Sequence, residues 1–179
     1  MGTVFWICWF FLLSMSKDVR TERNFRFVLD EIIVSSCDPD FIETFEFQIS
    51  QINNRSYVDS QMVLKRTVDW VGAHATLDFA KENSKKMRLY DVQVDACLFL
   101  GDRHRNRLFS MYAKGLKKHS NLSCPFKANF NYTMEKMYVD EEEFPSFVPF
   151  GSFRSVVEYL HNDGIGARTV TRGRFIPRT

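Results

Sequence analysis

Alternation of apolar and polar side chains is the feature of this sequence that most restricts its fold. In residues 71–79, Val, Ala, Ala, Leu and Phe alternate with Gly, His, Thr and Asp. Successive side chains of a strand point to opposite faces of its sheet, so a period of two predicts strands with one buried face. Strands are expected on the same grounds at residues 45–50, 90–98, 126–134, 153–160 and 167–175.

One segment has helical periodicity instead. Within residues 105–118, apolar side chains recur every three or four positions and polar side chains fall on the opposite side. The apolar positions are Leu108, Phe109, Met111, Tyr112 and Leu116. Aromatic residues make up 15% of the chain, which favours a β-rich fold with a large apolar interior. We therefore predict a mainly β fold, an antiparallel β-cup or sandwich with one amphipathic helix near 105–118.

The start of the chain has the pattern of a secretory signal peptide. Residues 4–15 are almost wholly apolar, and a helix of that length rises only ~18 Å, too little for the ~30 Å core of a bilayer. Ser14 and Ser16 are small residues of the kind that signal peptidase requires, so we expect cleavage before Lys17. The predicted organisation is a signal peptide at 1–16 and a single secreted β domain at 17–179. The alternative interpretations of the apolar run are an uncleaved membrane anchor and a buried strand.

Glycosylation sequons agree with export. Asn54, Asn121 and Asn131 each begin an Asn-X-Ser/Thr pattern. So short a pattern also arises by chance, but its combination with a signal peptide predicts that at least one of the three carries a glycan.

The cysteine count predicts an oxidised domain with an odd thiol. Cys8 leaves with the signal peptide, which leaves Cys37, Cys97 and Cys124. An odd count in a secreted domain predicts one disulfide together with one leftover thiol or an intermolecular bond. The alternative is three buried free thiols.

No catalytic or metal-binding constellation stands out. The four histidines lack metal-ligand spacing, and the chain has neither a nucleophile elbow nor a phosphate loop. We therefore expect no enzymatic activity, no cofactor and no metal. The net charge of +2, with acids and bases interleaved, gives no electrostatic case for nucleic-acid binding. The acidic residues 140–143 are interpreted as a solvated loop and not as a calcium site.

Blocks of sequence around the cysteines and near the C-terminal end follow one another in a distinctive order. They are Cys37-Asp38-Pro39, Val94-Asp95-Ala96-Cys97-Leu98-Phe99-Leu100, Cys124-Pro125-Phe126 and Pro149-Phe150-Gly151-Ser152-Phe153-Arg154. This order resembles a family of small secreted insect proteins, best represented in fruit flies, that includes the CheB-type chemosensory proteins and a domain of unknown function. The family is distantly similar to the ML lipid-recognition proteins and the ganglioside-activator protein.

The resemblance implies a β cup that holds acyl chains between its sheets and, in the chemosensory branch, a role in detecting contact pheromones. It also implies a disulfide between Cys97 and Cys124. Many members of the family have a further Cys where this chain reads Phe45-Glu46-Phe47-Gln48. The absence of that residue leaves Cys37 unpaired.

These observations together predict a secreted, non-enzymatic binder of a lipid or other hydrophobic ligand. The chain is expected to be a monomer, with a membrane receptor or channel as a further partner. The hydrophobic ligand pocket is predicted at Phe47, Phe79, Leu108, Phe109, Tyr112, Leu116 and Phe130. The alternative is an extracellular protein-interaction domain or co-receptor with a filled core, in which Cys37 forms a disulfide-linked dimer.

Overall fold

The computed structural model describes residues 23–81, 84–101, 104, 106–145, 148–161 and 164–178. The predicted signal peptide at 1–16 lies outside the described residues. Within them, no helix is long and apolar enough to cross a membrane.

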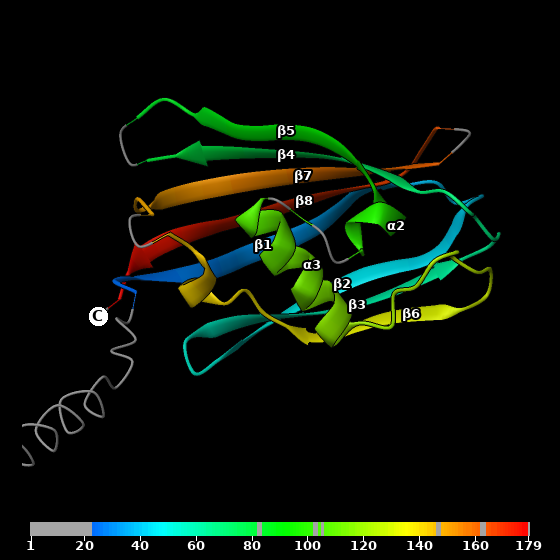
Figure 1. The fold of residues 1–179 in the computed structure, drawn as a ribbon, viewed down its shortest axis with the longest axis horizontal. Helices are drawn as coiled ribbons and strands as arrows, with labels where there is room; N and C mark the ends of the chain where they lie inside the picture. The colour runs from blue at the N-terminus through cyan, green and yellow to red at the C-terminus, as the bar shows by residue number, and fades with distance from the viewer. Residues whose placement is uncertain are drawn as a thin grey trace, which may run out of the picture.

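Two antiparallel β-sheets face each other in the described part of the chain (Figure 1). The larger sheet has the strand order β1-β8-β7-β4-β5, and the smaller sheet has the order β2-β3-β6. The larger sheet consists of β1 (Phe25–Cys37), β4 (Gly72–Ala80), β5 (Met87–Asp95), β7 (Gly151–His161) and β8 (Gly164–Pro177). The smaller sheet consists of β2 (Ile42–Ile52), β3 (Arg55–Leu64) and β6 (Asn131–Met137). The predicted mainly β fold is therefore confirmed.

The helical elements lie outside the sheets. The short helix α2 (Ala96–Phe99) continues directly from β5, and α3 (Arg107–His119) contacts β6. In Figure 1, α3 lies in front of the sheets, with β5 above it and β6 below it. The side chain of Asn106 accepts hydrogen bonds from the backbone N–H groups of Leu108 and Phe109 and so caps α3 at its start. The predicted amphipathic helix is confirmed, but it begins at Arg107.

Two predicted strands have different bounds in the structure. The strand expected at 126–134 is wrong in its first half, because β6 begins only at Asn131 and Asn129 turns the chain with a φ of 55°. Phe126 makes a single bridge with Val68 instead. The strand expected at 90–98 ends at Asp95, whose carboxylate accepts a hydrogen bond from the N–H of Leu98 and starts α2.

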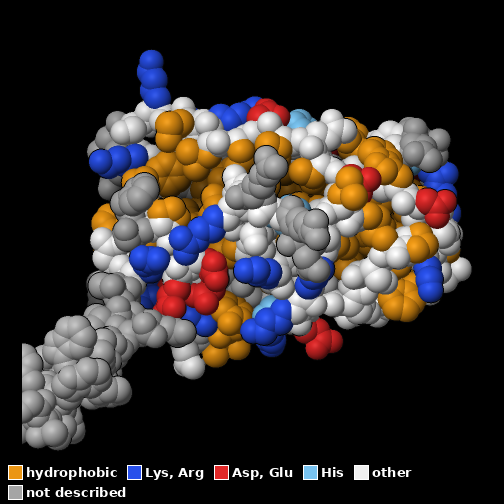
Figure 2. Space-filling model, viewed as in Figure 1, with side chains coloured by type: hydrophobic (Ala, Val, Ile, Leu, Met, Phe, Trp, Pro, Cys, Tyr) orange, Lys and Arg blue, Asp and Glu red, His pale blue; other side chains and the backbone are white. Residues whose placement is uncertain are grey.

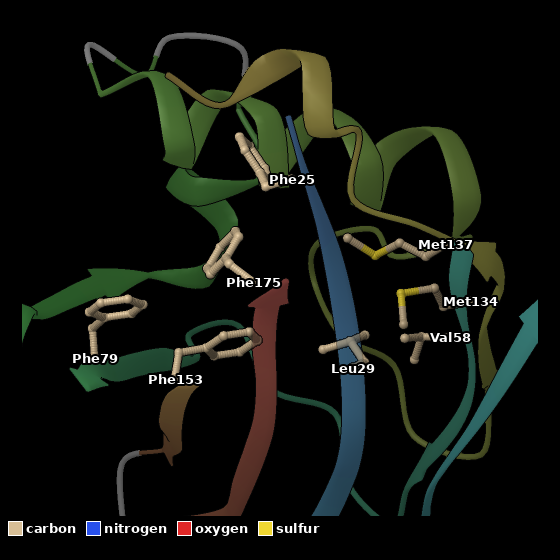
Figure 3. Close-up of a cluster of buried hydrophobic side chains, with 8 residues drawn as sticks. All are labelled: Phe25, Leu29, Val58, Phe79, Met134, Met137, Phe153 and Phe175. Carbon is tan, nitrogen blue, oxygen red and sulfur yellow. The ribbon is translucent and has the colours of Figure 1, made fainter. Parts of the chain in front are cut away.

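Buried side chains gather in two clusters toward opposite ends of the strands. In β8, for example, Phe175 belongs to the first cluster and Ala167 to the second. The first cluster joins both sheets and contains Phe25, Leu29, Val58, Phe79, Met134, Met137, Phe153 and Phe175 (Figure 3). The second contains Phe41, Ile42, Leu64, Phe126, Tyr132 and Ala167. Because each large buried side chain stabilises the fold by about 1.5–3 kcal/mol, these clusters hold the two sheets together.

The acidic segment has a structural role. The interpretation of residues 140–143 as a solvated loop is wrong for Glu141, which is 6% exposed and lies in the 3-10 helix η1 (Glu141–Glu143). Its carboxylate accepts a hydrogen bond of 2.7 Å from the N–H of Phe27 and pairs with the guanidinium of Arg178. Glu141 therefore ties the first strand to the end of the chain.

Candidate ligand-binding site

The inner face of the larger sheet changes from large to small side chains along its strands. Phe79 is buried in the first cluster, and Ala75 lies on the same face of β4. Ala75 pairs with Val92 of β5 and with Val157 of β7. All three of these smaller residues are only half-buried, although β4 is an interior strand of its sheet.

These half-buried residues lie between the two buried clusters. Ala75, Val92 and Val157 belong to neither of the two buried clusters. A residue on the inner face of an interior strand keeps accessible surface only where a space of at least water size lies beside it. The incompletely buried apolar and aromatic residues between the two clusters are here called the central hollow, after the ligand space proposed below. They are Ala75, Val92, Val157, Tyr159, Phe45, Phe47, Phe109 and Tyr112.

Aromatic rings connect the elements around the hollow. Phe45 of β2 contacts Tyr159 of β7 across the two sheets, with ring centroids 5.6 Å apart. On the helical side, the ring of Phe109 in α3 lies 5.8 Å from that of Tyr90 in β5 and 6.1 Å from that of Phe99 in α2. Hydrophobic side chains are visible in Figure 2 on the face of the molecule that carries α3. Aromatic contacts thus join β2 to β7 and join α3 to β5 and α2.

Tyr112 lies on α3, one turn after Phe109. It is 47% exposed, and its ring lies 6.4 Å from that of Phe99. Removal of water nevertheless raises the pKa of Tyr112, and the neighbouring phenols of Tyr159 and Tyr90 raise it further.

The three tyrosines differ in their hydrogen bonds. Burial also raises the pKa of Tyr90 and of Tyr159, but their hydroxyls are hydrogen-bonded to Ser155 and to Thr169. Within the described part of the chain, the Tyr112 hydroxyl has no such partner. It is therefore available to a bound molecule.

The structure brings together only some of the residues predicted to form the ligand pocket. Phe109 and Tyr112 lie together on α3, with ring centroids 6.1 Å and 6.4 Å from that of Phe99. Phe47 lies at the boundary, because it is half-buried and also packs against the first cluster. These three remain the best-placed members of the predicted set.

The other predicted pocket residues lie elsewhere. Phe79 is 5% exposed inside the first cluster, and Leu116 packs against that cluster. Phe130 is 42% exposed and contacts Tyr132, 4.7 Å away by centroid. Leu108 is half-buried on α3.

Sequence reasoning did not identify all residues of the site. Alternation along the strands places Ala75, Val157 and Tyr159 on strand faces but does not assign them to a pocket. The available signal was side-chain size: Ala73 and Ala75 occupy inner positions of a strand that ends with Phe79. Small side chains in the middle of a buried face leave volume that large neighbours at its end do not fill.

Two concavities also lie on the outer surface. One, of about 350 Å³, is lined by polar residues that include His119, Asn121 and Glu135. The other, of about 170 Å³, lies beside it and includes Met111 and Tyr138. None of the predicted pocket residues lines either concavity. In the part of the chain that the structure describes, no group of His, Cys, Asp and Glu is arranged to hold a metal ion.

The disulfide expected from the resemblance is present. Cys97 in α2 is bonded to Cys124, with a Cα–Cα distance of 5.9 Å. It connects the end of β5 in the larger sheet to the segment that leads into β6 in the smaller sheet. Cys37 is a free, exposed thiol at the end of β1. Partial burial and the adjacent carboxylate of Asp38 raise the pKa of this thiol.

The sequons lie on the surface. Asn54, Asn121 and Asn131 are all exposed, and Asn54 occupies the tight turn between β2 and β3 with a φ of 64°. The side chain of Asn121 accepts a hydrogen bond from the N–H of Thr133 and donates one to the carbonyl of Asn131.

Comparisons with known proteins give a family match and two structural likenesses. No curated protein sequence matches this chain. The crystal structure of chicken MD-1 complexed with lipid IVa is similar with a TM-score of 0.42 and 17% identity, over 86% of this chain and 98% of that chain. A Niemann-Pick type C2 protein from Japanese carpenter ant is similar with a TM-score of 0.33 and 16% identity, over 83% of this chain and 92% of that chain. Residues 73–155, which include both cysteines of the disulfide, match the family model described as "Protein of unknown function (DUF1091)".

Proposed function

We propose that this protein is a secreted, non-enzymatic carrier that holds a lipid or other hydrophobic ligand in the central hollow. The observation that carries the proposal is the half-buried inner face around Ala75, enclosed between two buried clusters. An apolar ligand in this space would remove both its own surface and these side chains from water. Such burial is favourable by ~25 cal/mol per Å² before the entropic costs of binding.

The export part of the proposal rests on the sequence. The apolar run at 4–15 and the small residues Ser14 and Ser16 support cleavage of a signal peptide before Lys17. The Cys97–Cys124 disulfide supports folding in an oxidising compartment. The exposure of Asn54, Asn121 and Asn131 supports glycosylation at one or more of them. A role in chemosensory detection, with delivery of the ligand to a membrane receptor or channel, is proposed on the motif resemblance alone.

The carrier function is tested on the secreted glycoprotein. Protein purified from the medium of a eukaryotic host is extracted with organic solvent, and the extract is analysed by mass spectrometry. We expect a co-purifying apolar molecule in stoichiometric amount, or saturable binding of a neutral fluorophore such as phenylnaphthylamine. Cooperative unfolding shows that the purified protein is folded. If such protein neither contains an apolar molecule nor binds the fluorophore, the proposal is contradicted.

The exposed thiol of Cys37 favours a second candidate function, an extracellular interaction domain linked through a disulfide. In that case the secreted protein runs as a dimer on a non-reducing gel and as a monomer after Cys37→Ser. A monomeric wild-type protein with a titratable thiol would leave only the carrier.

A further inference from the structure

The asparagines of the three sequons differ in the bonds that their side chains make. We propose that Asn121 stays unmodified in the secreted protein, because its amide clamps the edge of β6, and that Asn54 carries a glycan. This assignment rests on the proposed export of the chain. The bonds between Asn121 and β6 lead to its first part, and the exposed turn that holds Asn54 leads to its second part.

Asn121 is bonded to β6 much as a residue of a neighbouring strand would be. β6 is an edge strand of the smaller sheet, with β3 on its other side. The backbone N–H of Asn121 donates to the carbonyl of Thr133 over 3.1 Å. The side-chain oxygen of Asn121 accepts from the N–H of Thr133 over 2.8 Å, and its Nδ2 donates to the carbonyl of Asn131 over 3.0 Å. Because an open strand edge can pair with another chain, this clamp protects β6.

A glycan on Asn121 and the clamp exclude each other. In a strand, the carbonyl of one residue and the N–H of the second residue after it point to the same side. The oxygen and nitrogen of the Asn121 amide therefore face β6 together, and the hydrogen that Nδ2 donates lies on the side of the oxygen. A glycosylated amide is secondary and trans, so its sugar carbon takes this same position. Glycosylated Asn121 must therefore release the carbonyl of Asn131.

The segment around Asn121 is held on both sides and has no room to shift along β6. Before it, Ser120 ends α3 and forms a bridge with Met134 of β6. After it, Cys124 is fixed by the disulfide to Cys97. A sugar on Asn121 is therefore accommodated only by breaking the clamp, which leaves the edge of β6 open.

Asn54 makes no comparable bonds. It is exposed in the tight turn between β2 and β3, where its φ is 64°. In the part of the chain that the structure describes, no residue is hydrogen-bonded to the Asn54 side chain. A glycan at this turn extends into solvent and displaces no bond of the fold.

Site mapping on the full secreted glycoprotein tests the assignment. Protein from the medium of a eukaryotic host is treated with peptide N-glycosidase in heavy-oxygen water, which converts each glycosylated Asn to a labelled Asp, and the peptides are analysed by mass spectrometry. We expect label at Asn54 and none at Asn121. Label at Asn121, or none at Asn54, overturns the assignment, whereas recovery of the protein from the medium shows export independently.

A matched pair of substitutions separates the Asn121 amide from its sequon. Ser123→Ala, at an exposed position, removes the sequon and keeps the amide, whereas Asn121→Ala removes both. We expect Ser123→Ala to lose no glycan and to unfold in urea like the wild type. Asn121→Ala is expected to raise the equilibrium constant for unfolding about five- to thirtyfold, because two hydrogen bonds to β6 are lost.

Equal unfolding constants for Asn121→Ala and Ser123→Ala, or loss of a glycan in Ser123→Ala, would overturn the clamp. The same unfolding measurements are made on unglycosylated protein refolded from a bacterial host, so the role of the amide is decided whether or not the chain is exported. If the wild-type chain stays inside the eukaryotic cell without a glycan, the proposed export itself fails.

Discussion

Ala75 is the residue whose substitution distinguishes an open interior from a filled one. It pairs with Val92 and Val157 in the middle of the larger sheet and is half-buried there. The proposed carrier requires open space beside Ala75, so Ala75→Phe is expected to leave the free energy of unfolding within about 1 kcal/mol of the wild type, whereas overpacking a filled core costs about 1–3 kcal/mol. The same ring would occupy the volume of the ligand. Urea unfolding and titration with phenylnaphthylamine measure the two effects, and we expect stability to be kept and binding to be lost.

Ala167 provides the matched control for this substitution. It also lies on the larger sheet, but it is 1% exposed inside the second buried cluster. Ala167→Phe is therefore expected to lower the free energy of unfolding by about 1–3 kcal/mol or more. Equal losses of stability in the two variants would mean that the interior around Ala75 is as filled as that around Ala167.

Among the elements, strands β5, β4 and β7 are linked on their outer face by His74. Its Nε2 lies 2.8 Å from Asp91 and its Nδ1 lies 3.2 Å from Glu158. Hydrogen bonds to these two carboxylates raise the pKa of His74 above 6.5. The pKa of His74 is therefore higher in the folded protein than in the unfolded chain. The protonated ring stabilises the fold fully at pH values below the pKa of the unfolded chain, and this stabilisation is lost as the pH rises through the pKa of the folded protein.

His74→Gln tests this link through its pH dependence. The loss of unfolding free energy caused by the substitution is expected to be larger at about pH 5.5 than at about pH 8.5, because only the protonated ring attracts both carboxylates. Urea unfolding of both proteins at the two pH values measures the difference. A loss of equal size at both values would show that the ring acts through packing and not through its charge.

The disulfide links the two sheets through α2 and the segment before β6. Joining residues separated by 27 positions restricts the unfolded chain, so the double substitution Cys97→Ser with Cys124→Ser is expected to lower the free energy of unfolding by about 3 kcal/mol. Cys37→Ser, which changes an exposed thiol, serves as the control and is expected to have an effect below about 0.5 kcal/mol. A double variant as stable as this control would show that the sheets hold together without the covalent link.

In the molecule as a whole, the two ends of the described chain meet at Glu141. Glu141→Gln keeps an acceptor for the N–H of Phe27 but removes the charge that faces Arg178. Because hydrogen bonds to charged groups are worth about 1.5–3 kcal/mol, we expect a loss of about 2 kcal/mol in unfolding free energy. Glu46→Gln, at an exposed position of β2, is the matched control and is expected to be near neutral. Equal stability of the two variants, measured by urea unfolding, would contradict this role of Glu141.

Two separate buried clusters stabilise the molecule. Each cluster packs side chains of both sheets, so the sheets are joined on both sides of Ala75. Close packing is concentrated where Phe79, Phe153 and Phe175 meet, and Ala75 lies away from it.

Local alternation was sufficient to predict most of the strands, the helix and their apolar faces, since these follow from the two-residue and 3.6-residue periods of the chain itself. Alternation did not predict β1, because register shifts at Leu29/Glu31 and Val34/Ser36 interrupt the two-residue period of apolar side chains in this strand. It missed β3 because Ser56 and Ser60 lie on its inner face. How completely the apolar faces are buried was decided by the tertiary structure alone: Ala75 has Val92 and Val157 as its neighbours, and these come from distant parts of the chain. A sequence pattern records which side of a strand is apolar, but not the distance to the facing wall.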